Sequence, residues 1–292
     1  MKEFSLETRI RVLMNQYDFH FQKSLGQNFL IDEGALSQIV AGADVTKEDK
    51  VLEIGPGMGF LTEKLADAAG LVMTVELDGT LCEILTKLFS EEDNVVICHG
   101  DALRLDFASM AAEGEARGFE HPFKIVANLP YYITTPLIFY FLEHREYWSE
   151  MVLMVQKEVA QRIVATASTK NYGVLTLMVQ YDADSEVIFE VPASSFHPRP
   201  AVDSAVIRLT KRREPPCPVN DRKKFQSLVK AGFGQRRKTL SNALANGGLG
   251  LSKERVCALL TACGIDGKRR GETLSFEEYA LLANHWASDL FS

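Results

Sequence analysis

Apolar residues along the first 170 residues of this chain alternate between two spacings. Short apolar runs of strand type are followed by longer stretches in which apolar residues recur every three or four positions, as in helices. The expected strands are 51–54, 71–75, 95–98, 124–127 and 151–155, and the expected helices are 5–17, 60–69, 79–89, 135–143 and 157–165. This alternation is typical of parallel βαβ units, which bind ligands at the carboxyl ends of the strands.

The spacing changes after Asn171. Residues 172–181 have the pattern of a helix, and 185–191 and 204–210 have the pattern of two strands. The proline-rich segment Phe196-His-Pro-Arg-Pro200 connects these two strands. We expect them to close the sheet as an antiparallel edge hairpin.

Three prolines in the segment Glu214-Pro-Pro-Cys-Pro218 predict a linker, because proline interrupts regular structure. Beyond the linker the pattern is helical, and Ser275-Phe-Glu-Glu278 is typical of a capping box at the start of a helix. The predicted fold is therefore an α/β domain over residues 1–214 and a small all-helical domain over residues 215–292.

The composition is that of a globular protein, with 46 % hydrophobic and 24 % charged residues in 292. No apolar run approaches the roughly 18 residues of a membrane span, and the N-terminal residues lack the apolar core of a signal peptide. The five cysteines are odd in number and lack metal-ligand spacing. We expect reduced thiols, a cytoplasmic protein and no metal site.

Charge is unevenly distributed along the chain. The net charge is −7, yet residues 204–246 contain eleven Lys or Arg and only two acids. A basic segment on an acidic body is typical of a polyanion-binding face, although a solvated helix surface is the alternative. The candidates for RNA binding are six cations of this segment and one of the N-terminal loop. They are Lys23, Arg222, Lys223, Lys224, Arg236, Arg237 and Lys238.

Three of these cations, Arg236, Arg237 and Lys238, directly precede a run with helical spacing that begins at Thr239. A helix start disfavours positive charge because of the helix dipole. We therefore interpret this triplet as facing a phosphate, with an ion-paired or solvated face as the alternative.

A glycine-rich loop, Glu53-Ile-Gly-Pro-Gly-Met-Gly59, directly follows an expected strand. Its glycines allow a tight turn and close approach of the backbone to a ligand. A dinucleotide-binding fingerprint would need a glycine where Phe60 stands. The acidic Glu53 also suits a cationic ligand better than a pyrophosphate. The loop favours a cationic nucleoside cofactor, and a purely structural turn is the alternative.

Two acids support a nucleoside site. Glu76 ends the second expected strand, where a carboxylate can accept hydrogen bonds from both ribose hydroxyls. Asp101 follows the third, where it can accept a hydrogen bond from an adenine amine. The alternative for either residue is a helix N-cap.

The segment Asn128-Leu-Pro-Tyr131 follows the fourth expected strand. The Asn128 side-chain oxygen and the Leu129 carbonyl can accept hydrogen bonds from the amine of a nucleobase and free its lone pair for attack on a methyl group. Pro130 fixes the turn, and Tyr131 offers a stacking face. Phe196 is the candidate for the opposite face, with core packing as the alternative. These residues predict methyl transfer to an exocyclic amine, in which orientation supplies most of the rate.

Six segments match one family over nearly the whole chain. They resemble the small-subunit (16S) ribosomal RNA adenine dimethyltransferases, the kasugamycin-sensitivity methyltransferases. The matching segments are Lys23-Ser-Leu-Gly-Gln-Asn-Phe-Leu-Ile-Asp32, Glu53-Ile-Gly-Pro-Gly-Met-Gly59, Asn128-Leu-Pro-Tyr131, Phe196-His-Pro-Arg-Pro-Ala-Val-Asp-Ser204, Gln235-Arg-Arg-Lys-Thr-Leu240 and Lys268-Arg-Arg-Gly-Glu-Thr-Leu-Ser275.

The resemblance implies a Rossmann-like class I methyltransferase domain that uses S-adenosyl-L-methionine, and a helical C-terminal domain that binds RNA or the ribosome. The implied substrate is two adjacent adenines near the 3′ end of 16S rRNA, each methylated twice, in the precursor of the 30S subunit. We expect a monomer. The residues expected to bind the cofactor, with Gln27 and Gly57 added from the same two loops, are Gln27, Asn28, Leu30, Gly55, Gly57, Glu76, Asp101 and Asn128.

Three other functions are compatible with parts of this pattern. A large-subunit rRNA adenine methyltransferase of the macrolide-resistance type has similar motifs, but the basic C-terminal runs favour the small-subunit enzyme. A non-catalytic RNA-binding assembly factor is disfavoured by the intact Asn128-Leu-Pro-Tyr131 motif. A dinucleotide oxidoreductase is disfavoured by Phe60.

Overall fold

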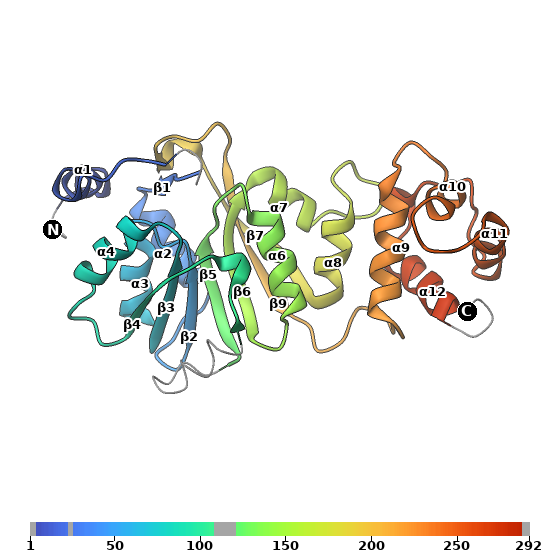
Figure 1. The fold of residues 1–292 in the computed structure, drawn as a ribbon, viewed down its shortest axis with the longest axis horizontal. Helices are drawn as coiled ribbons and strands as arrows, with labels where there is room; N and C mark the ends of the chain where they lie inside the picture. The colour runs from blue at the N-terminus through green and yellow to red at the C-terminus, as the bar shows by residue number, and fades with distance from the viewer. Residues whose placement is uncertain (1–3, 23–25, 108–120, 288–292) are drawn as a thin grey trace. The chain divides into compact units, whose positions relative to one another are not determined.

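The computed structural model describes residues 4–22, 26–107 and 121–287, and Figure 1 shows its fold. The chain divides into two compact units. The first unit comprises Met1–Ala160 and Glu186–Lys211, and the second comprises Gln161–Ser185 and Arg212–Ser292. This division differs from the expected split after residue 214 because Gln161–Ser185 belongs with the C-terminal helices. The functional boundary between the two domains stays a prediction.

A seven-stranded sheet has the order β4-β3-β2-β5-β6-β9-β7. Its first five strands in this order pair in parallel, and β9 pairs antiparallel with β6. The strands are β2 (Lys50–Ile54), β3 (Leu71–Glu76), β4 (Val95–His99), β5 (Phe123–Asn128), β6 (Trp148–Gln156), β7 (Ala183–Val191) and β9 (Ser204–Lys211). The sheet confirms the predicted α/β, Rossmann-like architecture with an antiparallel edge.

Helices pack against this sheet through apolar stripes. One core cluster joins Val51 of β2 and Val126 of β5 to leucines and isoleucines of the first four α-helices. The helices of this part of the chain are α1 (Leu6–Tyr17), α2 (Glu33–Gly42), α3 (Phe60–Ala68), α4 (Gly79–Leu88), α6 (Thr134–Glu143) and α7 (Lys157–Ile163), with short 3-10 turns at Ala102–Arg104 and Ala193–Ser195. The expected strands and helices are therefore present, with ends that differ by at most two residues except at the start of β6, which begins three residues earlier than expected.

A second, two-stranded sheet was missed by the sequence pattern. Its strands β1 (Phe29–Leu30) and β8 (Phe196–His197) pair antiparallel. The Ile31 amide also donates to the Ser195 carbonyl at 2.8 Å. The N-terminal segment that contains Phe29 and Leu30 is thus held in place by the proline-rich connection, which lies far from it in the sequence.

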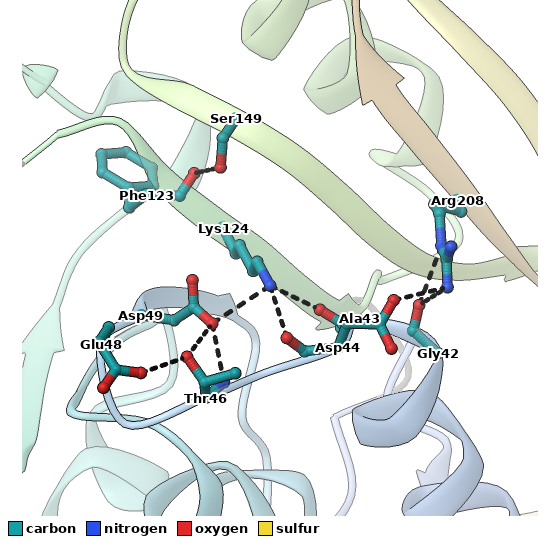
Figure 2. Close-up of polar contacts among 10 residues, drawn as sticks. All are labelled: Gly42, Ala43, Asp44, Thr46, Glu48, Asp49, Phe123, Lys124, Ser149 and Arg208. Carbon is teal, nitrogen blue, oxygen red and sulfur yellow. Dashed lines mark hydrogen bonds and ion pairs between the residues drawn. The ribbon is translucent and has the colours of Figure 1, made fainter.

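Helix α2 is attached to the large sheet by two basic side chains at its C-terminal end (Figure 2). Lys124 of β5 donates to the carbonyls of Ala43 and Asp44 at 2.9 and 2.8 Å. Arg208 of β9 donates through Nε to the carbonyl of Gly42 at 3.0 Å. These cations satisfy carbonyls that have no partner within the helix and complement its dipole.

The second unit contains α8 (Val174–Asp182), α9 (Arg222–Gly234), α10 (Leu240–Ala245), α11 (Lys253–Ala262) and α12 (Phe276–Ala287), with a 3-10 turn at Gly271–Thr273. Residues 214–218 contain no helix or strand, as expected of a linker. The predicted capping box is confirmed, because the Ser275 amide donates to Glu278 at 2.9 Å and the Glu278 amide donates to the Ser275 hydroxyl at 3.3 Å.

The triplet Arg236–Lys238 lies between the end of one helix and the start of the next, so two helix dipoles act on it. It precedes the six-residue α10, as expected, but it also directly follows the 13-residue α9. The C-terminal end of a helix favours positive charge. The end of α9 therefore offsets the unfavourable dipole at the start of α10, and the exposure and charge of the triplet are what favour contact with a phosphate.

Candidate active site

A cavity of about 1020 Å³, including its open mouth, lies in the first unit where β4, β3, β2 and β5 end. It brings together all eight residues expected to bind the cofactor and the other three residues of the Asn128–Tyr131 segment, which we call the target-base motif. These residues are Gln27, Asn28, Leu30, Gly55, Gly57, Glu76, Asp101, Asn128, Leu129, Pro130 and Tyr131. Their roles stay predictions, but their proximity follows from the parallel strands, whose carboxyl ends share one edge.

The glycine-rich loop forms one wall of the cavity. Gly55 and Gly57 have φ values of 65° and 58°, in the left-handed region that favours glycine. A Cβ atom on Gly57 would lie 2.7 Å from the ring of Phe29, which also lines the cavity. The loop therefore needs glycine both for its backbone conformation and for its contact with the N-terminal segment.

The Glu76 carboxylate is the best-supported acceptor in the cavity. The side chain is only 7 % exposed, and its oxygens accept hydrogen bonds from the amides of Gly57, Leu77 and Asp78 at 3.2, 2.9 and 3.0 Å. Burial nevertheless raises the pKa of Glu76. Each carboxylate oxygen can accept more than one hydrogen bond, so Glu76 can still accept from two ligand hydroxyls.

A second carboxyl group, that of Glu53, lines the same cavity and is 1 % exposed. The Thr62 hydroxyl donates to it at 2.6 Å. Burial raises the pKa of Glu53 to about 8, with a smaller contribution from the negative charge of Glu76, and the hydrogen bond from Thr62 opposes the shift. A cation bound in the cavity would favour the ionised form of Glu53.

Asp101 has the N-cap role that the sequence pattern left as the alternative, and its role toward a ligand stays a prediction. Its Oδ1 accepts a hydrogen bond from the Leu103 amide at 3.0 Å, which makes it the N-cap of a 3-10 turn. The residue also lines the cavity. The N-cap interaction holds the carboxylate at the end of β4 and is compatible with a hydrogen bond to a ligand.

Gln27 is held by a residue that the sequence analysis missed. Its side chain donates to Asp78 at 3.0 Å and accepts from the Gln22 amide at 2.7 Å. Asp78 is the N-cap of α4 and accepts there from Thr80 at 3.0 Å. Because these contacts already engage both ends of the Gln27 amide, its first role is to position the cavity wall. The Asp-Gly-Thr sequence at the start of α4 is a capping pattern that could have identified Asp78.

The target-base motif continues directly from β5. The Leu129 amide donates to the carbonyl of Met154 at 3.1 Å, which ties the motif to β6. The Asn128 amide nitrogen donates to the carbonyl of Asn28 in a long hydrogen bond of 3.5 Å. Because the amide nitrogen is the atom that makes this contact, the contact is compatible with the predicted role of the Asn128 side-chain oxygen as an acceptor.

Two aromatic residues differ from expectation. Phe196 does not line the cavity, is 3 % exposed and belongs to the core cluster that also contains Phe29 and Leu30 of β1. The structure therefore places it in the core-packing role given as the alternative. Tyr132, to which the sequence assigned no role, lines the cavity and is exposed.

Three of the expected RNA-binding cations form contacts within the second unit. Arg222 is 2.6 Å from Asp182, and Lys224 donates to the carbonyl of Trp286 at 3.1 Å. Arg236 is 3.4 Å from Glu272. The other expected RNA-binding cations of that unit, Lys223, Arg237 and Lys238, are exposed, and Lys23 lies outside the described residues.

The described residues contain neither a helix that could cross a membrane nor a cluster of metal-binding side chains.

Comparison with protein families assigns the chain. The model of the family described as "Ribosomal RNA adenine dimethylase" matches residues 18–288. The chain belongs to the ribosomal RNA adenine dimethylase family. As a member of this family it is a methyltransferase that uses S-adenosyl-L-methionine.

Similar proteins and structures agree with this assignment. The adenine dimethylase is 48 % identical over 285 residues to "Ribosomal RNA small subunit methyltransferase A" of Geobacillus kaustophilus, covering 97 % of each chain. It is 46 % identical to the protein of the same name from Clostridium acetobutylicum, covering 97 % of this chain and 99 % of that one.

Among solved structures, a dimethyladenosine transferase from Plasmodium falciparum has a TM-score of 0.74 at 28 % identity, covering 88 % of this chain and 97 % of that one. The 23S rRNA methyltransferase ErmE has a TM-score of 0.66 at 27 % identity, covering 89 % of this chain and all of the other.

The residues that line the cavity fit S-adenosyl-L-methionine in their chemistry. The glycine loop leaves backbone exposed to a ligand, and the buried Glu76 can accept hydrogen bonds from a ribose. A bound sulfonium and ammonium group would favour the ionised, negative form of the buried Glu53. Among the described residues that line the cavity there is no cation to oppose such a ligand.

Replacing Glu76 with Ala should weaken binding of S-adenosyl-L-methionine, because the ribose loses a charge-assisted acceptor. The expected cost is about 1.5–3 kcal/mol, or roughly ten- to hundredfold in Kd. Calorimetric titration measures this affinity, and Glu83→Ala, which removes an exposed acid from α4, is the control. Unchanged affinity in a folded Glu76→Ala variant would rule out the assigned role.

Replacing Glu53 with Gln should stabilise the protein increasingly as the pH rises from 4.5 to about 8. In this window the unfolded chain ionises Glu53 while the folded protein keeps it protonated, so wild-type stability falls with pH through this group. Gln keeps an acceptor for Thr62 without the titration. Thermal unfolding across the window measures the difference, and the exposed Glu92→Gln serves as the control. A stability difference that stays constant with pH would contradict the expectation.

Proposed function

We propose that this adenine dimethylase transfers methyl groups from S-adenosyl-L-methionine to the exocyclic amines of two adjacent adenines near the 3′ end of 16S rRNA, within the precursor of the 30S subunit. The observation that supports this most is the single cavity that joins the glycine loop, Glu76 and the Asn128–Tyr131 motif. The names of the bacterial relatives favour the small subunit over the large one.

Within the cavity, the residues act mainly by orientation. The Asn128 side-chain oxygen and the Leu129 carbonyl accept the two amine hydrogens and direct the nitrogen lone pair out of the adenine ring plane. Tyr131 provides the face on which the base lies. The bound cofactor supplies the electrophilic methyl group. The attacked amine becomes cationic and loses a proton readily, so the site needs no strong general base.

The helical C-terminal domain, residues 215–292, is proposed to bind rRNA through exposed cations. Lys223, Arg237 and Lys238 are the strongest candidates in the described part of that domain, because Arg222, Lys224 and Arg236 already contact groups of the protein. A ribosomal substrate also supports a cytoplasmic location. A monomer is the proposed state of the free enzyme.

The substrate can be tested directly with labelled cofactor. The adenine dimethylase should methylate 30S particles that lack these modifications, and it should leave 50S precursors unlabelled. Label in the 50S precursors would favour the large-subunit alternative. Label in neither particle, with the cofactor bound, would favour a non-catalytic assembly factor.

Asn128→Ala should slow methyl transfer to these 30S particles by about 10²–10³-fold, because one polar group that orients the amine is lost. Particle binding should persist. The single-turnover rate measures the effect, and Asn171→Ala, which removes an exposed side-chain amide, is the control. Near wild-type dimethylation by Asn128→Ala would show that the proposed orientation of the amine is wrong.

Replacing Arg237 and Lys238 together with Ala should weaken particle binding and reduce the salt dependence of log K by roughly 0.7–0.9 for each lost phosphate contact. Arg236→Ala should instead lower the unfolding temperature and leave the salt slope nearly unchanged, because Arg236 is paired with Glu272. Binding measured over a range of salt concentrations separates the two effects. The same slope in wild type and the double variant would assign both residues to the solvated surface.

A further inference from the structure

Tyr131 has a partner outside its own loop. Its hydroxyl is hydrogen-bonded to the hydroxyl of Ser204, with the two oxygens 2.6 Å apart. Tyr131 lines the cavity, whereas Ser204 is 0 % exposed and does not line it. Ser204 is the first residue of β9 and pairs with Gln156 of β6. The ring on the cavity side is thus linked to a buried point of the sheet.

The backbone of the motif is restrained separately. The Pro130 carbonyl accepts hydrogen bonds from the Ile133 amide at 3.2 Å and the Thr134 hydroxyl at 3.0 Å. Together with the hydrogen bond from Leu129 to β6, these contacts fix the path of the chain. They do not fix the side-chain torsions of Tyr131. The hydrogen bond to Ser204 restrains the position of the hydroxyl end of the ring.

The chain next to Ser204 is also held by hydrogen bonds. The side chain of its neighbour Asp203 accepts a hydrogen bond from the Ala193 amide at 2.9 Å, and the Asp203 carbonyl accepts one from the Lys157 amide at 3.0 Å. These contacts tie the start of β9 to the residues just before the proline-rich connection and to the first residue of α7. Ser204 therefore has little freedom to follow a moving tyrosine.

We propose that Ser204 is a positioning residue for methyl transfer: it sets the angle of the Tyr131 ring and thereby the plane in which the target adenine lies. This inference rests on the proposed role of Tyr131 as the stacking face. Ser204 touches neither substrate nor cofactor. Because an in-line reaction depends on the angle between the amine and the methyl group, a loosely held ring lowers the rate more than it lowers binding.

The test compares Tyr131→Phe, Ser204→Ala and the double variant, with unmodified 30S particles as substrate. Each single variant should reduce kcat roughly three- to tenfold, the effect of losing one hydrogen bond, with little change in KM for the particle or in Kd for the cofactor. The double variant should be no slower than the slower single variant, because both changes remove the same interaction. Ser149→Ala removes a hydroxyl from the other end of β6, where it donates to the Phe123 carbonyl (Figure 2), and should retain the wild-type kcat.

Tyr131→Ala distinguishes the positioning role of Ser204 from the stacking role of Tyr131 on which it rests. A large loss of rate in Tyr131→Ala, with wild-type kcat in Tyr131→Phe and Ser204→Ala, would keep the stacking role and overturn the positioning role. Losses that multiply in the double variant would also overturn it, since the two hydroxyls would then act independently. Wild-type rates in Tyr131→Ala would instead reject the stacking face itself. Tyr131→Phe keeps the ring and does not alter the buried strand, so it remains informative if Ser204→Ala unfolds.

Discussion

The burial of the Glu76 carboxylate is the constraint on which the cavity depends. A buried acid costs several kcal/mol unless hydrogen bonds replace its water, typically about 1–3 kcal/mol for each group left unsatisfied. Here the donors are amides of Gly57 in one loop and of Leu77 and Asp78 in the next. Asp78 in turn holds Gln27 of the N-terminal segment. Satisfying one carboxylate therefore arranges three separate pieces of chain around the same space.

Much of this arrangement can be predicted from the sequence, because it depends on local signals. Apolar runs mark the strands, and the residues that follow them, such as Glu76 and Asn128, lie together because parallel strands end at one edge. The pairing of Phe29–Leu30 with Phe196–His197 has no local signal, since two-residue strands carry no periodicity. The packing of Phe196 and the contacts of Asp78 depend on that pairing or on distant partners, and they became visible only in the structure.

The basic segment shows why a count of charges overstates a binding surface. Arg222 lies 5.1 Å from the ring centre of Tyr181 and pairs with Asp182, a nearly fully buried acid. A cation that neutralises a buried carboxylate cannot be removed or redirected without leaving that charge unpaired. Sequence separates such structural cations poorly from exposed ones, because both have the same composition and helical spacing. The exposed Arg237 and Lys238 are distinguished from Arg222 by their surroundings rather than by their sequence.

The small sheet formed by β1 and β8 also has a consequence for the order in which the protein folds. Asp32 and Ser195, hydrogen-bonded just beyond these strands, are 163 positions apart in the chain. Contacts of such sequence separation are slow to form because a long loop must close first. During synthesis, the ribosome must translate the proline-rich connection before the N-terminal wall of the cavity can be anchored. The nascent chain can therefore build the strands and the glycine loop early, but it acquires a complete cofactor pocket only late in translation.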